Sequence, residues 1–188
     1  QASFNGNLLM QPTGLTGGGI IRLDKAEVNS NLFTYNANWF GSEQANINIF
    51  EETGSLAFHA DNWRTHIDLK MREGIFTNGL DPVELPANQY ICYIDKFKWS
   101  MDEELLTLGD EVASVGKRVE FISAHPNQDS LNFTAQTASY SLKDYIIHAK
   151  GVESIPVADA IIYPDSGIVT VAKKAVIQTL YGAKILAN

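Results

Sequence analysis

The chain has 188 residues, a net charge of -8 and a pI near 4.9, with 45% hydrophobic and 19% charged residues. That apolar fraction is enough for a buried core and excludes disorder as the dominant state. The acidic balance argues against nucleic acid and anionic membrane surfaces as partners, because both require clustered Lys and Arg. The one cysteine, Cys92, excludes an internal disulfide and a cysteine-rich zinc site.

The two ends and the hydropathy bear on localisation. No run approaches the roughly 20 apolar residues needed to span a bilayer, so we predict no transmembrane segment. The chain starts with Gln1-Ala2-Ser3, without a Met or an apolar signal region. It therefore fits either a mature form after signal removal or a segment cut from a longer protein. The lone cysteine, the many Asn and Thr residues and the β-rich pattern favour an exported setting, periplasmic or associated with the cell envelope.

The first 19 residues are predicted to be irregular. They contain Pro12, Gly14 and the triplet Gly17-Gly18-Gly19. Glycine loses more backbone entropy on ordering than any other residue, which disfavours a regular element here.

Period-two alternation follows, and it predicts half-buried strands. Apolar residues alternate with polar ones over 33–39, 45–49 and 67–71. In the first of these runs, the alternation places Trp39 on the same face as Phe33 and Tyr35, which predicts that Trp39 packs in the core.

The middle of the chain gives a mixed pattern. Residues 90–99 have bulky side chains on both faces, which predicts one long strand buried on both sides, with Cys92 inside it. Residues 101–116 are the best helix candidate, because Asp102, Glu103 and Glu104 suit the positive end of a helix dipole. Gly109 weakens that interpretation, and a strand followed by a turn is the alternative.

The last third alternates short apolar runs with turn residues, which is typical of a meander, roll, sandwich or solenoid. The predicted fold is therefore all-β, with many short strands in a roll, jellyroll or sandwich and at most one short helix near 101–108. We expect a single extended domain over residues 1–188, with a weak division near 73–88. The predicted strands of this part are 131–135, 145–149, 155–157, 160–163, 168–171, 175–177 and 183–186.

A family resemblance rests on the stretch Ala138-Ser-Tyr-Ser-Leu-Lys-Asp-Tyr-Ile-Ile-His-Ala-Lys-Gly-Val152. It resembles the repeated unit of the OstA-like, lipopolysaccharide-transport β-jellyroll proteins, and the similar style continues to residue 188. The resemblance implies an open roll with an elongated, apolar-lined groove for acyl chains and end-to-end contacts between rolls. It assigns no individual binding residue.

One cluster of residues has metal-ligand chemistry. His59 and His66 flank Asp61, and a hairpin would bring the three side chains together. Their spacing matches no familiar site, and His66 falls on the polar face of its strand, so solvated surface histidines are the favoured interpretation. We therefore predict no metal and no cofactor.

Aromatic and acidic residues offer two further sites. Trp63 is the weak ligand-binding candidate, because Asp61, Asn62 and Arg64 surround it and suggest an exposed ring that stacks on sugars. The three acids at 102–104 contain enough carboxylates for glycoside hydrolysis, although acids at a helix start usually serve the dipole.

Three functions follow in order of preference. The first is a non-enzymatic cell-envelope β-roll that acts as a scaffold, adaptor or carrier of a lipid-like ligand. The second is a carbohydrate-binding β-sandwich, and the third is a β-jellyroll hydrolase. The short strands run to the last residues without a protective cap, which predicts contact with a protein partner, or self-association, through the terminal strands.

Overall fold

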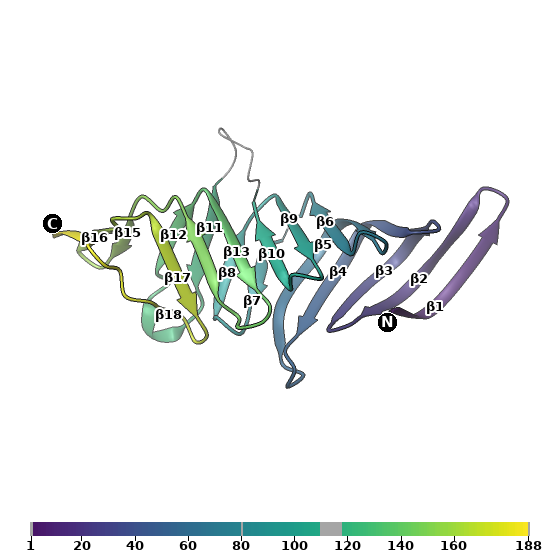
Figure 1. The fold of residues 1–188 in the computed structure, drawn as a ribbon, viewed down its shortest axis with the longest axis horizontal. Coiled ribbons are helices and arrows are strands. Elements are labelled where there is room, and N and C mark those ends of the chain that lie inside the picture. Colours follow the sequence, from purple (N-terminus) through teal and green to yellow (C-terminus); the bar gives the residue numbers. More distant parts are fainter. Residues whose placement is uncertain (1, 80, 110–117, 188) are drawn as a thin grey trace.

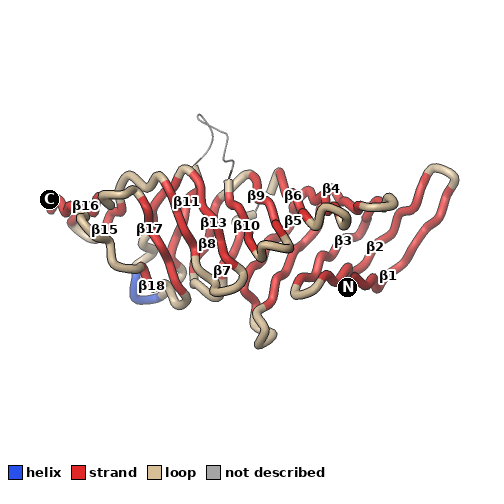
Figure 2. Tube along the Cα trace, in the orientation of Figure 1, coloured by secondary structure: helices blue, strands red, loops and turns tan. Residues whose placement is uncertain are grey.

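The computed structural model describes residues 2–79, 81–109 and 118–187, and this part of the chain is almost entirely β-structure (Figures 1 and 2). Within these ranges the strands all pair antiparallel, which confirms the predicted all-β class. The molecule is elongated, with the N-terminal hairpin projecting from one end and the C-terminus at the other (Figure 1).

The strands shorten along the chain. The first five are long: β1 (Ala2–Gln11), β2 (Gly14–Leu23), β3 (Ala26–Tyr35), β4 (Trp39–Phe50) and β5 (Leu56–Asp68). The next seven are β6 (Glu73–Thr77), β7 (Val83–Leu85), β8 (Tyr90–Tyr93), β9 (Lys96–Ser100), β10 (Leu105–Leu108), β11 (Val119–Ser123) and β12 (Asn132–Ala135). The last seven are β13 (Thr137–Ser141), β14 (Ile147–Lys150), β15 (Ile155–Val157), β16 (Ala160–Tyr163), β17 (Ile168–Ala172), β18 (Val176–Ile177) and β19 (Lys184–Ala187). A 3-10 turn, Pro126–Gln128, lies between β11 and β12.

Beyond β6 the chain places successive hairpins alternately in two layers. Strands β6, β9, β10, β13, β14, β17 and β18 pair in that order and form the first layer. Strands β7, β8, β11 and β12 pair in that order and form the second layer, and β15, β16 and β19 form a small sheet beside β12. The fold is therefore a roll built from stacked hairpins, within the range of architectures that the short runs predict.

The crossings from the first layer use residues with left-handed backbone conformations. Asn78 directly follows β6, Gly109 follows β10 and Gly151 follows β14, with φ of 56°, 88° and 70°. Gly and Asn are the residues that adopt this region most readily. In each of the three cases the residue directly follows the last residue of the strand. A structural repeat is present, but the loops between its units differ in length, so the sequence shows no fixed period.

A buried amide ties the two layers together at one end. Asn88 lies in the turn between β7 and β8 and is fully buried. Its Nδ2 donates to the backbone oxygens of Tyr145 (2.8 Å) and Val171 (3.2 Å), which belong to the first-layer side. Hydrogen bonds of this kind fix how the second layer sits on the first, because a buried amide without partners is costly.

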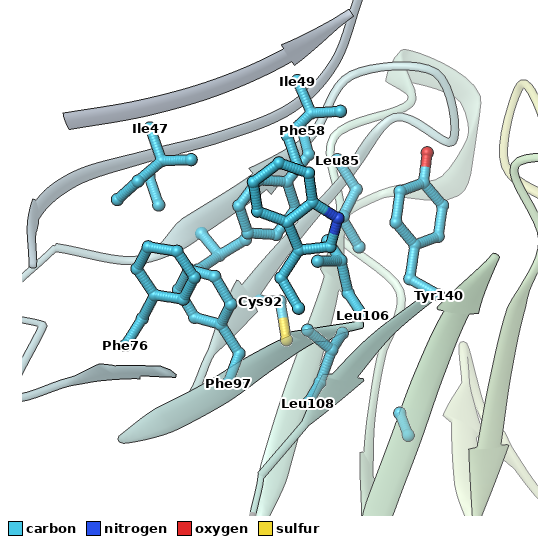
Figure 3. Packing of buried hydrophobic residues seen from close by; sticks show 14 of the residues in the cluster. Ile47, Ile49, Phe58, Phe76, Leu85, Cys92, Phe97, Leu106, Leu108 and Tyr140 are labelled. Atoms are coloured by element: carbon cyan, nitrogen blue, oxygen red, sulfur yellow. The ribbon is translucent and has the colours of Figure 1, made fainter. Parts of the chain in front are cut away.

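Aromatic and aliphatic side chains fill the space between the layers (Figure 3). Phe97 lies at the centre, stacked on Phe76 at 4.3 Å and in edge contact with Phe58 and Trp63. All four rings are fully buried. The interior is thus close-packed by side chains, as protein cores generally are.

The prediction of an irregular N-terminus is wrong. Residues 2–11 and 14–23 form the hairpin of β1 and β2, which pair over ten consecutive positions. The glycine triplet lies inside β2, where a Cβ on Gly18 would lie 2.4 Å from the Asn31 carbonyl oxygen. Close backbone approach explains these glycines better than a flexible loop does.

Two of the alternating runs contain a turn rather than one strand. β3 ends at Tyr35 and β4 begins at Trp39, so 33–39 spans a strand, a turn and a new strand. Likewise β5 ends at Asp68, and Leu69 and Met71 are exposed by 41% and 65% in the turn before β6. Alternation continued by chance through both turns, while Ala45, Ile47 and Ile49 are buried as predicted.

The predictions for 90–99 and 101–116 also change. Residues 90–99 form β8 and most of β9, with a change of layer between them, which is why bulky residues occupy both faces. Residues 105–108 form β10, so the alternative of a strand and turn is correct there, and the predicted helix is wrong within 101–109. The remainder of that prediction, 110–116, lies outside the described residues.

Cys92 is buried in β8, as predicted, and burial raises the pKa of its thiol above the ordinary 9.0. The thiolate is the reactive form, so we expect a thiol reagent to modify the native chain slowly and the denatured chain quickly. Raising the pH to about 9 should speed only the denatured reaction, because only there does the thiol ionise. Rapid modification of the native chain at neutral pH would contradict this burial.

Candidate functional site

The pairing of the long strands is interrupted along one line across the sheet. Between β3 and β4 the register runs to Asn29 opposite Asn46 and resumes only at Thr34 opposite Gly41. The register between β2 and β3 shifts between Gly17 and Gly19, and β4 and β5 shift at neighbouring positions. Bulges bend the strand that carries them and redirect its side chains.

Two serine hydroxyls replace the missing backbone pairing. The N–H groups of Leu32 and Gln44 donate to the Oγ atoms of Ser30 and Ser42, both at 3.1 Å. The two hydroxyls lie 2.8 Å apart, and each is within 2.9 Å of the Gln44 carbonyl oxygen. The interruption is therefore a satisfied, ordered feature rather than a frayed stretch of sheet.

A groove of about 770 Å³ lies over this interruption, on the outer face of β3, β4 and β5. Most of its lining side chains carry amide or hydroxyl groups. Among the described residues, the amides are Asn29, Asn31, Gln44, Asn46 and Asn62, and the hydroxyls are Ser30, Thr34, Ser42 and Thr65. The remaining lining residues are Leu32, Trp39, Gly41, Glu43, Arg64 and His66.

An aromatic ring lies among these polar groups. Trp39 is half-buried at the start of β4, and its ring lies 4.9 Å from the ring of His66 on β5, centroid to centroid. Gly41 allows β4 to approach β5 closely beside this ring, because a Cβ there would lie 2.8 Å from the Thr65 carbonyl oxygen. The indole is thus held from one side by His66 while part of it faces the groove.

The charges of the groove are paired. The Nε and Nη2 of Arg64 on β5 lie 2.8 and 2.6 Å from the Glu43 Oε2 on β4. Both side chains are more than half exposed, so the pair adds little stability, but it leaves this part of the groove without net charge.

The two tryptophans exchange the roles that the sequence predicts. Trp63 is completely buried, in edge contact with Phe97 at 4.9 Å, so the ring has no exposed face for a ligand. A backbone residue with φ of 60°, Asn62, precedes it, and the local shift turns Trp63 inward although its neighbours are polar. Trp39, predicted to pack in the core, lines the groove, because the turn before it moves Phe40 into the buried register.

The predicted metal candidates are only partly brought together. The Nε2 of His59 lies 3.0 Å from the Asp61 Oδ2, and its Nδ1 lies 2.6 Å from the Asn48 Oδ1. His66 lies further along β5 and stacks on Trp39 instead. Within residues 2–79, 81–109 and 118–187, no three His, Cys, Asp or Glu side chains gather closely enough to hold a metal ion.

We expect a strong chelator to leave the melting temperature of the chain unchanged. Any metal bound only by the native state would stabilise it by mass action, and its removal would lower the melting temperature. Differential scanning fluorimetry with and without the chelator measures this. A clear drop that added Zn²⁺ reverses would instead assign a metal to His59 and Asp61.

Two of the three acids at 102–104 belong to surface ion pairs around a smaller cavity of about 310 Å³. Asp102 pairs with Arg72, and Glu104 lies 3.6 Å from the Nζ of Lys25. Apolar side chains of Trp99, Met101 and Leu142 also line this cavity. The carboxylates thus neutralise neighbouring cations around a turn, and they do not begin a helix.

Among the described residues, no helix has the length and apolar character needed to cross a membrane. No protein-family model matches this chain, and no curated protein matches its sequence. The assignment of function therefore depends on the chemistry of the groove.

Proposed function

We propose that this chain is a non-enzymatic carbohydrate-binding protein that takes neutral oligosaccharides in the groove over β3, β4 and β5. The observation that carries the proposal is the partly exposed Trp39 ring, fixed on a strand beside a row of amide side chains in a hollow of about 770 Å³. Binding sites of this kind combine a hollow, an apolar contact and a few polar groups that fix orientation.

The polar lining suits a ligand rich in hydroxyl groups. A sugar hydroxyl both donates and accepts, and Asn and Gln side chains offer a donor and an acceptor in fixed geometry. Five such amides line the groove, from all three strands that form it. Their backbones are held by regular pairing on either side of the interruption, which limits the entropy lost on binding.

Trp39 supplies the apolar contact. One face of a pyranose ring consists largely of C–H groups, and the face of an indole offers a large, rigid surface for it at little cost in side-chain entropy. His66 restricts the tilt of the ring. A sugar ring stacked on Trp39 would extend over the amides of β3 and β4.

The charge of the lining favours neutral ligands. Glu43 and Arg64 neutralise each other, and no other Asp, Glu, Lys or Arg belongs to the described lining. A strongly anionic or cationic sugar would find no unpaired counter-charge there. The same feature argues against hydrolysis, because glycosidases require two carboxyl groups, and this lining has one.

A carrier of acyl chains, which the family resemblance implies, needs an open apolar interior. Here the rings of Phe58, Trp63, Phe76 and Phe97 occupy the centre of the space between the layers. A sugar ligand agrees equally well with the exported, cell-envelope setting that we expect from the sequence.

An oligosaccharide array tests this proposal with the intact chain. We expect retention on one class of neutral oligosaccharides, and no comparable retention on anionic sugars or on immobilised acyl chains. Retention on acyl chains alone would support a lipid carrier and contradict the sugar-binding groove, as would no retention on any sugar.

A further inference from the structure

The first strand presents a long open edge. β1 runs from Ala2 to Gln11 and pairs with β2 at every position, without a bulge. No described strand pairs with its other side. Its outward N–H and C=O groups form a template for another strand, which is the feature that monomeric β-proteins usually protect.

The protecting devices found on other edges are missing from β1. At the opposite end of the molecule, β18 has two residues and follows Lys173 and Lys174, and β19 has four residues and begins with Lys184. Short strands and edge lysines discourage pairing with another chain. β1 has ten residues with no charge and no proline.

Apolar side chains extend from both faces of this edge strand. Leu8, Leu9 and Met10 are exposed by 56%, 54% and 82%, and they are consecutive, so they alternate between the two faces. Neither layer of the roll covers this end of the hairpin (Figure 1). A strand added beside β1 would shield these side chains on both faces.

The distribution of charge favours a second copy as the partner. Residues 2–21 contain no Asp, Glu, Lys or Arg, although the chain carries a net charge of -8. The first charged side chain along the chain, Arg22, pairs with Glu27 at 2.7 Å. Two acidic copies repel each other in most relative orientations. The repulsion is weakest where the two uncharged β1 edges face each other.

We propose that β1 pairs antiparallel with β1 of a second copy across a two-fold axis, joining the two sheets into one. Such an interface is self-complementary, as in most homodimers. A two-fold axis keeps each side chain on its own face, so facing residues of the two strands are both even-numbered or both odd-numbered. Pairing over residues 3–11 places Phe4 opposite Met10 of the second copy, and it places Asn7 opposite Asn7 of the second copy on the axis. This inference is independent of the groove, whose lining begins at Asn29.

The position of Asn7 on the axis permits a charge-swap test. Asn7→Lys and Asn7→Glu each bring two like charges together, and like charges on facing strands are destabilising. We expect the unaltered chain to sediment as a dimer at millimolar concentration and each variant to sediment as a monomer. An equimolar mixture of the two variants should recover a one-to-one dimer, because the opposite charges then meet.

Asn132→Lys is the matched control, because it adds the same charge to an exposed position of β12, far along the chain from β1. It should leave the dimer intact, and circular dichroism should show native β-structure in all variants. The proposal fails if the unaltered chain stays monomeric to millimolar concentration, if either Asn7 variant alone still dimerises, or if the mixture does not associate.

Discussion

Replacing Trp39 by alanine should weaken oligosaccharide binding about thirtyfold, which corresponds to about 2 kcal/mol and is typical of a tryptophan anchor. The substitution removes the apolar surface of the groove and leaves its amides in place. Because Trp39 is only half-buried, the free energy of unfolding should change by about 1 kcal/mol or less. Isothermal titration calorimetry with an oligosaccharide selected from the array, together with denaturant unfolding, measures both quantities.

Trp39→Phe is the conservative control, because it keeps an aromatic face of smaller area, and it should recover part of the lost affinity. His66→Ala should cause a smaller loss than Trp39→Ala, because it frees the indole without removing it. If the unaltered chain and Trp39→Ala bind the oligosaccharide with equal affinity, the Trp39 ring is not part of the binding site.

Replacing Trp63 by alanine should have the opposite profile, with a loss of stability of about 3–5 kcal/mol. The indole is completely buried between Phe97 and Gly79, where a Cβ on the glycine would lie 2.1 Å from the ring. Truncation therefore leaves a large cavity at the point where β5 meets the first layer. Urea unfolding followed by circular dichroism measures the change.

Trp63→Phe should cost clearly less than Trp63→Ala, because most of the ring is retained. It also removes the indole Nε1, which is buried and has no hydrogen-bond partner in the described part of the chain. Where Trp63→Ala remains folded, its affinity for the oligosaccharide should exceed that of Trp39→Ala. A stability loss below about 1 kcal/mol would contradict the core position of Trp63.

Most strands of the last third are predictable because each apolar run ends at a turn, whereas β13 (Thr137–Ser141) is absent from the predicted strands. β16 spans the predicted residues 160–163, and β15 spans 155–157. Alternation also identifies the buried residues of β4 from Ala45 to Ile49. These features depend on local pattern alone, which is what sequence periodicity reports.

The layer assignment depends on long-range pairing, which local pattern does not contain. Nothing in residues 90–99 marks the change of layer between β8 and β9, because both strands bury the same kind of side chain. The sequence does not predict the ten-residue β1 for a related reason. Its glycine-rich partner strand reads as a loop until close backbone packing against β1 and β3 explains the glycines.

The sequence does not predict the groove, because most of its lining residues lie outside the alternating runs 33–39, 45–49 and 67–71. Thr34 and Asn46 lie on the polar faces of those runs, where half-buried strands meet solvent. One signal was present: six asparagines occur between residues 29 and 48. The alternation in the sequence does not predict the groove position of Trp39. A three-residue turn between β3 and β4 shifts the register by one, so Phe40 takes the buried position in place of Trp39. A shift of one residue moves every following side chain to the other face of a sheet.

The indole N–H signals of the three tryptophans give the most direct test of the sugar-binding groove. A ¹H–¹⁵N NMR titration of the intact chain with the selected oligosaccharide follows Trp39, Trp63 and Trp99 in one spectrum. Trp63 and Trp99 are buried, and neither lines the groove. The account predicts that the Trp39 signal and the side-chain amides of Asn31 and Asn46 shift with saturation, while the other two indole signals stay in place. Saturable binding that leaves Trp39 and these amides unchanged would contradict it.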